Sequence, residues 1–342
     1  MERLGVLATL SENRSRGLAA ESVRLRRRFE AAGVEVLFLK GAALGQLAYG
    51  DPGLKQGRDI DLLVSPLDAE PALRLLCAEG YQIIAPARNP TEAQRRIVYR
   101  LHKDMELFHP ERRLNVELHW RLVDNPELLK GVGPGSARRD VALADGALPT
   151  LADGELFAYL CAHGASHAWF RLKWLADLNA WLTSKDAAQI AGLYREAARL
   201  GVEDCAGEAL ALCHRLLGLE IPASLAPAPK TARVRRLVAG ALDAMIGPDG
   251  ETELSRRPFG GLRLLPAQYL RGRGRRFLLA QGRLHLDSLD DRLALPLPRR
   301  LGFLYPLLRG PMWLVRVVRR RLGRAAGTVR SSRFGDGMAD GT

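Results

Sequence analysis

The hydrophobic periodicity of this chain changes near residue 151, and that change limits the possible folds more than any other feature. Before it, short apolar runs such as 34–39 and 59–64 alternate with stretches of helical period. After it, residues 151–250 contain helical patterns only. Helices repeat their apolar positions about every 3.6 residues, whereas strands are short and either alternate or are wholly apolar. The sequence therefore predicts an α+β protein, in which a small N-terminal mixed-sheet domain is followed by an all-helical domain and a basic C-terminal tail.

The individual elements follow from the same patterns and from the Gly and Pro residues at their ends. The predicted strands are 34–39, 59–64, 81–84, 97–101 and 114–120. The predicted helices are 15–33, 42–49, 66–80, 154–167, 170–184, 186–200, 204–218 and 230–246. Segment 126–150 is rich in Gly, Pro and Asp and is interpreted as a linker. The expected divisions are an α/β domain at 1–125, the linker at 126–150, the helical domain at 151–250 and the C-terminal region at 251–342.

The positive charge of the chain is concentrated at its C-terminal end. Residues 251–342 hold 19 arginines and 7 acidic residues, a net charge of +12, whereas residues 1–250 carry +1. Such asymmetry predicts an anionic partner surface for the tail. Apolar side chains after Pro311 lie beside arginines, a composition suited to a membrane interface more than to nucleic acid, which favours interleaved aromatic groups. The apolar residues in question are Trp313, Leu314, Val317 and Val318.

An alternative for this tail is that its helix docks on the helical domain of the same chain, and residues 325–342 are expected to be disordered. The four cysteines are widely spaced and form neither a zinc-type C-x-x-C pair nor a secreted disulfide framework. The N-terminus lacks the pattern of a secretory signal, and no apolar run reaches the roughly 18–20 residues of a membrane-spanning helix. The expected location is therefore the cytoplasm, with the tail at the inner face of the membrane.

Three acidic residues in the α/β domain predict a metal site. Asp59 and Asp61 are two apart on a predicted strand, so their carboxylates share one face at a spacing of about 7 Å. Glu117 lies on another predicted strand, between Val116 and Leu118, which we expect to anchor it in the core. Three carboxylates on neighbouring strands form the hard-oxygen site that Mg²⁺ prefers. A pair of such ions supports phosphoryl-type transfer.

The tripeptide Lys40-Gly41-Ala42 stands where the first predicted strand meets the following helix. A helix N-terminus presents free N–H groups and partial positive charge to a phosphate, and glycine lets the backbone approach closely. Lys40 adds a point charge there. Taken separately, the acidic pair and this helix start also fit a solvated strand end and an ordinary helix start, because short motifs match often by chance.

Taken together, these motifs resemble a known family. The order L-K-G-A-A-L, Y-G-D-P-G-L-K, R-D-I-D-L-L-V and N-V-E-L-H-W is similar to the bacterial uncharacterised nucleotidyltransferase family, a branch of the polymerase-beta-type superfamily, over about residues 10–185. The resemblance implies a Mg²⁺-dependent enzyme that moves a nucleoside monophosphate from an NTP such as ATP to a hydroxyl of a small molecule, saccharide or peptide, with release of pyrophosphate.

The resemblance also implies roles for individual residues. Gly41 and Ala42, with Lys40, would hold the triphosphate, and Asp59 and Asp61 would bind two magnesium ions. Glu117 would be the third carboxylate, which completes the metal site and helps to activate the acceptor. The chain departs from the superfamily at the helix start, where Gly-Gly or Gly-Ser is usual, and at Lys55, where the branch often has Arg.

A second cluster lies in the predicted helical domain. His163 and His167 are four apart on one helix face, and the run from His163 to Asp177 is similar to the H-x-x-x-H and R-L-x-W-x-x-D pattern of the same branch. No nearby residue supplies the further ligands of a zinc site. We interpret His163, His167, Arg171 and Lys173 as lining an inter-domain cleft against the triphosphate or the acceptor. A core contact among His163, Trp174 and Asp177 is the alternative.

Two residues beside the acidic strands are further candidates. His119 shares the strand face of Glu117, so it either positions the acceptor, orients Glu117 or supports the structure. Arg58 precedes the acidic pair and is either a phosphate contact or a surface charge. The remaining histidines have no spacing that singles them out, namely His102, His109, His214 and His285.

Two other functions stay open on the sequence. One is a toxin-like nucleotidyltransferase that acts on tRNA, which the basic tail permits. The other is an inactive, membrane-associated scaffold that binds nucleotides. The intact set of three carboxylates argues against the scaffold, because like charges held together are costly unless they serve a ligand.

Overall fold

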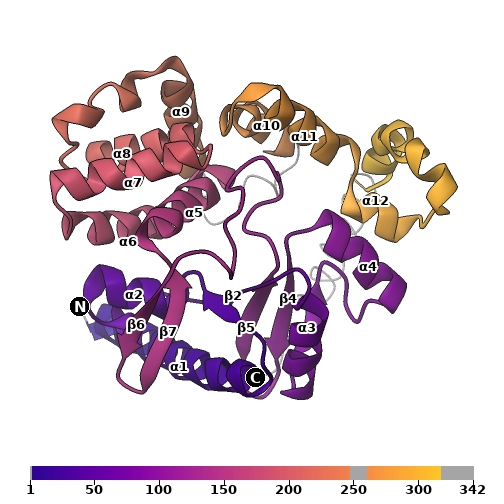
Figure 1. Cartoon of the computed structure of the whole chain (residues 1–342), viewed down its shortest axis with the longest axis horizontal. Helices are drawn as coiled ribbons and strands as arrows, with labels where there is room; N and C mark the ends of the chain where they lie inside the picture. Colours follow the sequence, from indigo (N-terminus) through magenta and orange to yellow (C-terminus); the bar gives the residue numbers. More distant parts are fainter. Residues whose placement is uncertain (1, 247–259, 317–342) are drawn as a thin grey trace, which may run out of the picture. The chain divides into compact units, whose positions relative to one another are not determined.

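The computed structural model describes residues 2–246 and 260–316. The chain divides into two compact units, 1–281 and 282–342. The first unit contains the sheet, the helices that cover it and a helical bundle, as Figure 1 shows. The architecture is α+β, as predicted.

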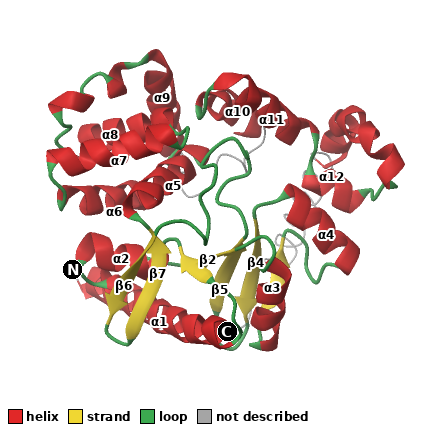
Figure 2. Ribbon diagram, viewed as in Figure 1, coloured by secondary structure: helices red, strands yellow, loops and turns green. Residues whose placement is uncertain are grey.

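A five-stranded mixed sheet is the centre of the N-terminal half (Figure 2). Its order is β1-β2-β5-β4-β3, in which β2 and β5 run parallel and all other neighbours run antiparallel. The strands are β1 (Val36–Phe38), β2 (Asp59–Val64), β3 (Gln82–Ala85), β4 (Asp104–His109) and β5 (Leu114–His119).

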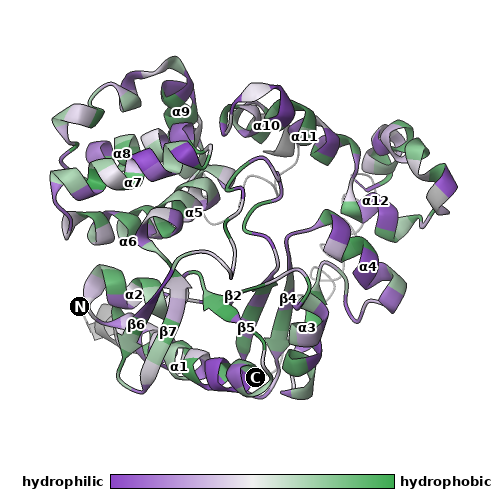
Figure 3. Ribbon diagram, viewed as in Figure 1, coloured by the Kyte–Doolittle hydropathy of each residue, from purple (hydrophilic) through white to green (hydrophobic). Residues whose placement is uncertain are grey.

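Alternation along the strands separates a packed face from a functional face. Ile60, Val116, Leu118 and Leu107 are buried on one face, against which helices α1 (Glu2–Ala31) and α3 (Ala69–Ala78) pack. Figure 3 shows β2 in the green of hydrophobic residues. Because side chains alternate, the acidic residues of β2, β4 and β5 project together from the opposite face.

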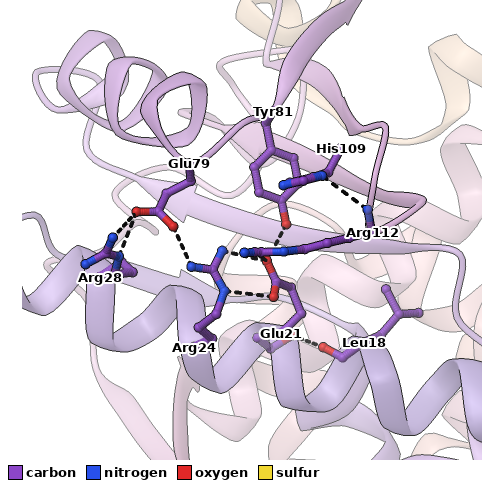
Figure 4. A network of polar contacts seen from close by, with 9 residues as sticks. Leu18, Glu21, Arg24, Arg28, Glu79, Tyr81, His109 and Arg112 are labelled. Carbon is purple, nitrogen blue, oxygen red and sulfur yellow. Dashed lines mark hydrogen bonds and ion pairs between the residues drawn. The ribbon is translucent and has the colours of Figure 1, made fainter.

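A polar network holds α1 to the far edge of the sheet (Figure 4). The buried Glu21 carboxylate accepts hydrogen bonds from the Tyr81 hydroxyl at 2.7 Å, from Arg24 at 2.8 Å and from Arg112 at 2.7 Å. Arg24 also pairs with Glu79, directly after α3. Since buried carboxylates need donors, this set of partners fixes α1 relative to the sheet.

One predicted strand is wrong. Residues 97–101 form the second half of helix α4 (Glu92–Leu101), and the strand lies later, as β4. A short apolar run does not distinguish a strand from one face of a helix. Thr91 and Gln94 form a capping box at the start of α4, and this Thr-x-x-Gln signal is the one that identifies the helix.

Segment 126–150, interpreted as a linker, contains most of a two-stranded antiparallel hairpin. Its strands are β6 (Arg138–Leu143) and β7 (Gly146–Leu151). Val141 and Leu148 are buried, and β7 packs beside β1 and α1. Of the Gly and Pro residues that favoured a linker, only Gly146 and Pro149 lie on this hairpin, where a missing ladder hydrogen bond is tolerated, and the others precede β6.

The helical predictions after residue 151 are confirmed. Helix α5 lies at the centre of the bundle, with Phe157, Tyr159 and Cys161 fully buried. It packs against α7 and α8. The helices of the first unit not yet named are α2 (Gly41–Tyr49), α5 (Asp153–Ser166), α6 (Leu172–Thr183), α7 (Ala187–Arg199), α8 (Glu203–Leu217), α9 (Ala232–Ile246), α10 (Gly260–Leu270) and α11 (Gly274–Leu286), the last of which continues into the second unit.

The second unit has its own ion pairs. It contains α12 (Leu289–Ala294), the 3₁₀ helix η5 (Arg299–Leu304) and a helical stretch at 305–316. The buried Asp291 carboxylate pairs with Arg309 at 3.0 Å and with Arg316. The predictions for Val317, Val318 and the disorder of 325–342 lie outside the described residues. Within the described ranges, every helix is too short or too polar to cross a bilayer.

Candidate active site

A cleft of about 530 Å³ opens over the acidic face of the sheet. It is lined from below by β2, β4 and β5 and by the start of α2, and from above by α5, α6 and α10. Of the residues that the sequence singles out for the site, all but Ala42 and His119 line this cleft. Those two are buried just behind its wall.

Parallel pairing of β2 with β5 brings the carboxylates together. Asp61 lies opposite Glu117, and Asp59 lies opposite Asn115. One potential ligand atom from each of Asp61, Glu117 and His119 lies within 4.8 Å of the other two. Asp59 lines the cleft but is outside this group. The reason is geometric, because neighbouring strands are about 4.8 Å apart, whereas residues two apart on one strand are separated by about 7 Å.

Asp61 is the most deeply buried of these carboxylates, at 3% exposed. Its Oδ1 atom lies 2.7 Å from Lys40 Nζ and 3.6 Å from His119 Nε2. Burial favours the neutral acid, but the charges of Lys40 and His119 outweigh it and hold the pKa of Asp61 well below its usual range. The carboxylate is therefore ionised inside the protein.

His119 connects the acidic residues of three strands. Its Nε2 atom lies 3.3 Å from Glu117 Oε2, and its Nδ1 atom lies 3.4 Å from Asp104 Oδ2. Burial opposes a charge on the ring, yet Asp104, Asp61 and Glu117 raise the pKa of His119. Asp104 itself is held by His102 at 2.9 Å and by Lys103.

The donor set fits a divalent cation. Both ring nitrogens of His119 are shielded from water, and neither meets hydrogen-bond geometry with another described residue. Asp61 Oδ1, also shielded, has the charged contact with Lys40. Buried polar atoms in that condition are costly unless a ligand completes them. Two carboxylate oxygens, with a third carboxylate on the neighbouring position of β2, form an oxygen-rich site of the kind that Mg²⁺ or a similar ion occupies.

Glu117 has a pKa suited to proton transfer. Burial and the nearby negative charge of Asp61 raise the pKa of Glu117 to about 7. A carboxyl group near neutrality accepts a proton far better than one with an ordinary acidic pKa.

The start of α2 forms one end of the cleft. Gly41 has φ +56°, a left-handed conformation that side chains rarely adopt, although a Cβ there would meet only the Asp59 carbonyl, at 3.9 Å. Its conformation, not a lack of space, therefore requires glycine. Three cations, Arg58, Arg171 and Lys173, line this end and also a neighbouring groove of about 910 Å³.

Lys173 is partly buried at this end of the cleft. Its ammonium donates a hydrogen bond to the Gln56 carbonyl at 3.2 Å. Burial and the positive charge of Lys55 lower the pKa of Lys173 to about 8. An anion bound beside it would relieve both effects.

The Asp177 carboxylate binds two side chains of the fold itself. It pairs with the buried Lys55 at 3.2 Å and accepts a hydrogen bond from the Tyr49 hydroxyl at 2.8 Å. The alternative contact of His163 with Trp174 exists, with ring centroids 5.1 Å apart, but Asp177 takes no part in it. His167 packs on the same two rings. Burial, together with the charge of Lys40, lowers the pKa of His163 well below its usual range, so that ring is neutral.

Several lining residues were missed in the sequence. His102, Lys103, Asp104 and Glu106 lie on or just before β4. They were missed because this strand was placed too early, although the alternation of Asp104, Glu106 and apolar residues is a strand signal. Arg271 also lines the cleft, from the turn between α10 and α11.

A comparison with protein families identifies the family of this chain. A family model described as uncharacterised nucleotidyltransferase matches residues 3–218, which include the whole sheet, the cleft residues of β2, β4 and β5, and helices α5 to α8. No curated protein matches the chain.

Proposed function

This chain belongs to the uncharacterised nucleotidyltransferase family, and from that premise we propose that it transfers a nucleoside monophosphate from an NTP to a hydroxyl of an acceptor and releases pyrophosphate. The acceptor class we propose is a small molecule, a saccharide or a peptide. The observation that carries the proposal is the grouping of Asp61, Glu117 and His119, in which both carboxylates line the same cleft as the Gly41 helix start.

A divalent cation is part of the proposal. Asp61 and Glu117 would hold it, with Asp59 at the edge of the cleft available for a second ion, and Mg²⁺ is the ion expected for oxygen ligands and a triphosphate. When bound, the metal would neutralise the charge of the phosphate oxygens.

Binding of the triphosphate and removal of the acceptor proton are assigned to residues of this chain. Lys40 and the N–H groups at Gly41 and Ala42 bind the triphosphate, and Arg58 and Lys173 add charge at the same end. The acceptor oxygen attacks the α-phosphorus, the bond to the bridging oxygen breaks, and pyrophosphate leaves. Its hydroxyl proton passes to the Glu117 carboxylate, which lines the cleft opposite Asp61.

The other predicted residues support this arrangement. His119 orients Glu117, from which it is 3.3 Å away. Arg171 lies over the rings of Phe170 and Trp174 at the cleft wall, where it would contact a phosphate or the acceptor. His163 and His167 form the neighbouring wall, and Asp177 positions Lys55.

The test is an Asp61→Asn variant in a transfer assay. Each α-labelled NTP is incubated with Mg²⁺, the purified protein and fractionated small molecules, peptides or total tRNA. We expect the wild type and the control Asp140→Asn, an exposed residue of β6, to transfer label. Asp61→Asn should fold with a lower Tm, because Lys40 keeps only a neutral partner, and should lose transfer. Transfer retained by Asp61→Asn would refute the assignment, and label on tRNA would favour the tRNA alternative.

We propose further that the C-terminal region contacts an anionic membrane surface. Within the second unit, Leu307 is 73% exposed, Phe303 68% and Leu314 56%, next to basic residues. Apolar side chains beside arginines are suited to a lipid interface. Co-sedimentation with phosphatidylglycerol vesicles, and none with phosphatidylcholine vesicles, is the expected result, and a Leu307→Glu/Leu314→Glu variant should stay in solution.

A further inference from the structure

Four cations that line the cleft have no carboxylate partner among the described residues, and they lie at two different ends. Arg58, Arg171 and Lys173 share the end near α2 and α6, where they also line the neighbouring groove. Arg271 lines the cleft but not that groove. It follows α10, which lies well away from α2 and α6 in Figure 1.

The turn that carries Arg271 is held firmly by its neighbours. The buried Asp204 carboxylate on α8 pairs with Arg233 at 2.7 Å and with Arg273 at 2.6 Å. Arg233 also donates hydrogen bonds to the carbonyls of Tyr269, Leu270 and Gly272, on both sides of Arg271. The backbone at Arg271 is therefore fixed, and its side chain is presented to the cleft in a defined place.

Arg271 itself differs from these paired arginines. Its Nε atom is shielded from water and has no hydrogen-bond partner, and its side chain makes no ion pair within the ranges 2–246 and 260–316. Burial lowers the pKa of Arg271, but a guanidinium stays charged in proteins. Asp124 and Glu208 act on its charge without forming an ion pair. A half-buried cation in that position is unfavourable, and an anion bound in the cleft would reduce the penalty.

The position of Arg271 indicates which ligand that anion belongs to. Arg271 and Lys103 both interact electrostatically with Asp124, and Lys103 directly precedes β4. Lys173, by contrast, lies near Lys55 and Asp59 on the β2 side. Glu117 is on β5, between these two sides. A triphosphate at the β2 side leaves the β4 side for the molecule that receives the nucleotide.

We propose that Arg271 binds an anionic oxygen group, a phosphate ester or a carboxylate, on the acceptor whose hydroxyl reacts beside Glu117. This inference rests on the proposed function and names its substrate class. The planar fork of a guanidinium binds either group through two parallel hydrogen bonds. Gln268 of α10 and His102, just before β4, also line the cleft and supply further polar groups.

Arg271 lies outside the part of the chain that the family model matches. The family match ends at residue 218, so this acceptor contact comes from a part of the chain that the family model does not include. The metal and nucleotide residues lie inside the match. Part of acceptor binding would therefore come from the segment after residue 218, separately from the transfer chemistry.

The test measures binding of simple anions and of nucleotide separately. Inorganic phosphate and acetate are titrated by calorimetry into the full-length wild type, Arg271→Met, Arg271→Lys and the control Arg195→Met, an exposed residue of α7. Titrations are run with and without Mg²⁺ and a non-hydrolysable NTP. We expect Arg271→Met to weaken binding of phosphate or acetate by at least about tenfold, Arg271→Lys to weaken it less, and NTP affinity to stay within about twofold.

Thermal unfolding separates this role from a structural one. Removing a charge that has no partner should leave the Tm of Arg271→Met unchanged or raise it, whereas a structural arginine would lower it. The inference is overturned if the wild type binds neither anion, if Arg271→Met binds them equally well, or if that variant loses NTP affinity instead. If no NTP binds any variant, the proposed function fails, while Arg271-dependent anion binding still establishes the anion site.

Discussion

Lys40 Nζ lies 2.7 Å from Asp61 Oδ1, and both side chains are largely buried. The lysine precedes the helix start that we assign to the triphosphate, and the aspartate belongs to the group that we assign to the metal. The two proposed sites are therefore joined by one ion pair. The ammonium neutralises the same carboxylate that a cation would bind, so the two positive charges compete for it.

A Lys40→Met variant tests this competition. It leaves Asp61 buried without its main counterion, so we expect a loss of stability of about 3–5 kcal/mol, the usual effect of breaking a buried pair. Mg²⁺ should then raise the Tm of the variant more than that of the wild type, because the ion takes over the role of the lysine. Lys130→Met, which removes an exposed pair with Glu127, is the control and should change the stability by about 1 kcal/mol or less. An equal Mg²⁺ response in Lys40→Met and wild type would contradict the shared role of Asp61.

The low pKa of Lys173 predicts a pH dependence of nucleotide binding. A lysine is charged below its pKa, here about 8, so its attraction for a triphosphate is present at pH 7 and is lost as the pH rises through that value. We expect NTP affinity to fall between about pH 7 and pH 9, and the fall to be much smaller in Lys173→Arg, whose charge persists. Calorimetry at constant ionic strength measures the NTP affinity of both proteins at each pH. If the NTP affinity of wild type and Lys173→Arg showed the same pH dependence, Lys173 would not be a residue that binds the triphosphate.

Gly41→Ala tests the helix start. The left-handed φ of +56° makes any side chain there strained, at a cost of about 1–3 kcal/mol. We expect a lower Tm and weaker NTP binding. Gly17→Ala is the control, since Gly17 lies within α1, has no atom within 4 Å of an added Cβ and should gain up to about 1 kcal/mol. Normal NTP binding by a folded Gly41→Ala variant would show that this backbone does not contact phosphate.

Asp177→Asn separates a structural role from an acceptor role. The change leaves Lys55 as a buried cation with a neutral partner, so we expect a clear loss in Tm and little change in the KM for NTP. Tyr49→Phe, which removes only the hydrogen bond to Asp177, should lose less. An unchanged Tm with a raised acceptor KM would instead assign Asp177 to substrate binding.

Local patterns were enough to predict much of this protein. The strand at 59–64, the helix at 42–49 and the helices after residue 151 follow from hydrophobic periodicity and from Gly and Pro at their ends, because these signals act over a few neighbouring residues. The same period of two correctly places Asp59 and Asp61 on the cleft face and Ile60 in the core. The prediction of a strand at 97–101 was wrong because an apolar run of that length fits both a strand and one face of a helix.

The grouping of side chains required the tertiary structure. Parallel register between β2 and β5 sets Asp61 against Glu117 and His119, and no pattern within either strand contains that register. Arg271 reaches the cleft only because Asp204 and Arg233, far away in the sequence, hold its turn. The sequence by itself determined most of the elements and most of the residues that could do chemistry, since these depend on local conformation. The structure decided which of those residues meet, because distances between separate elements depend on packing across the whole fold.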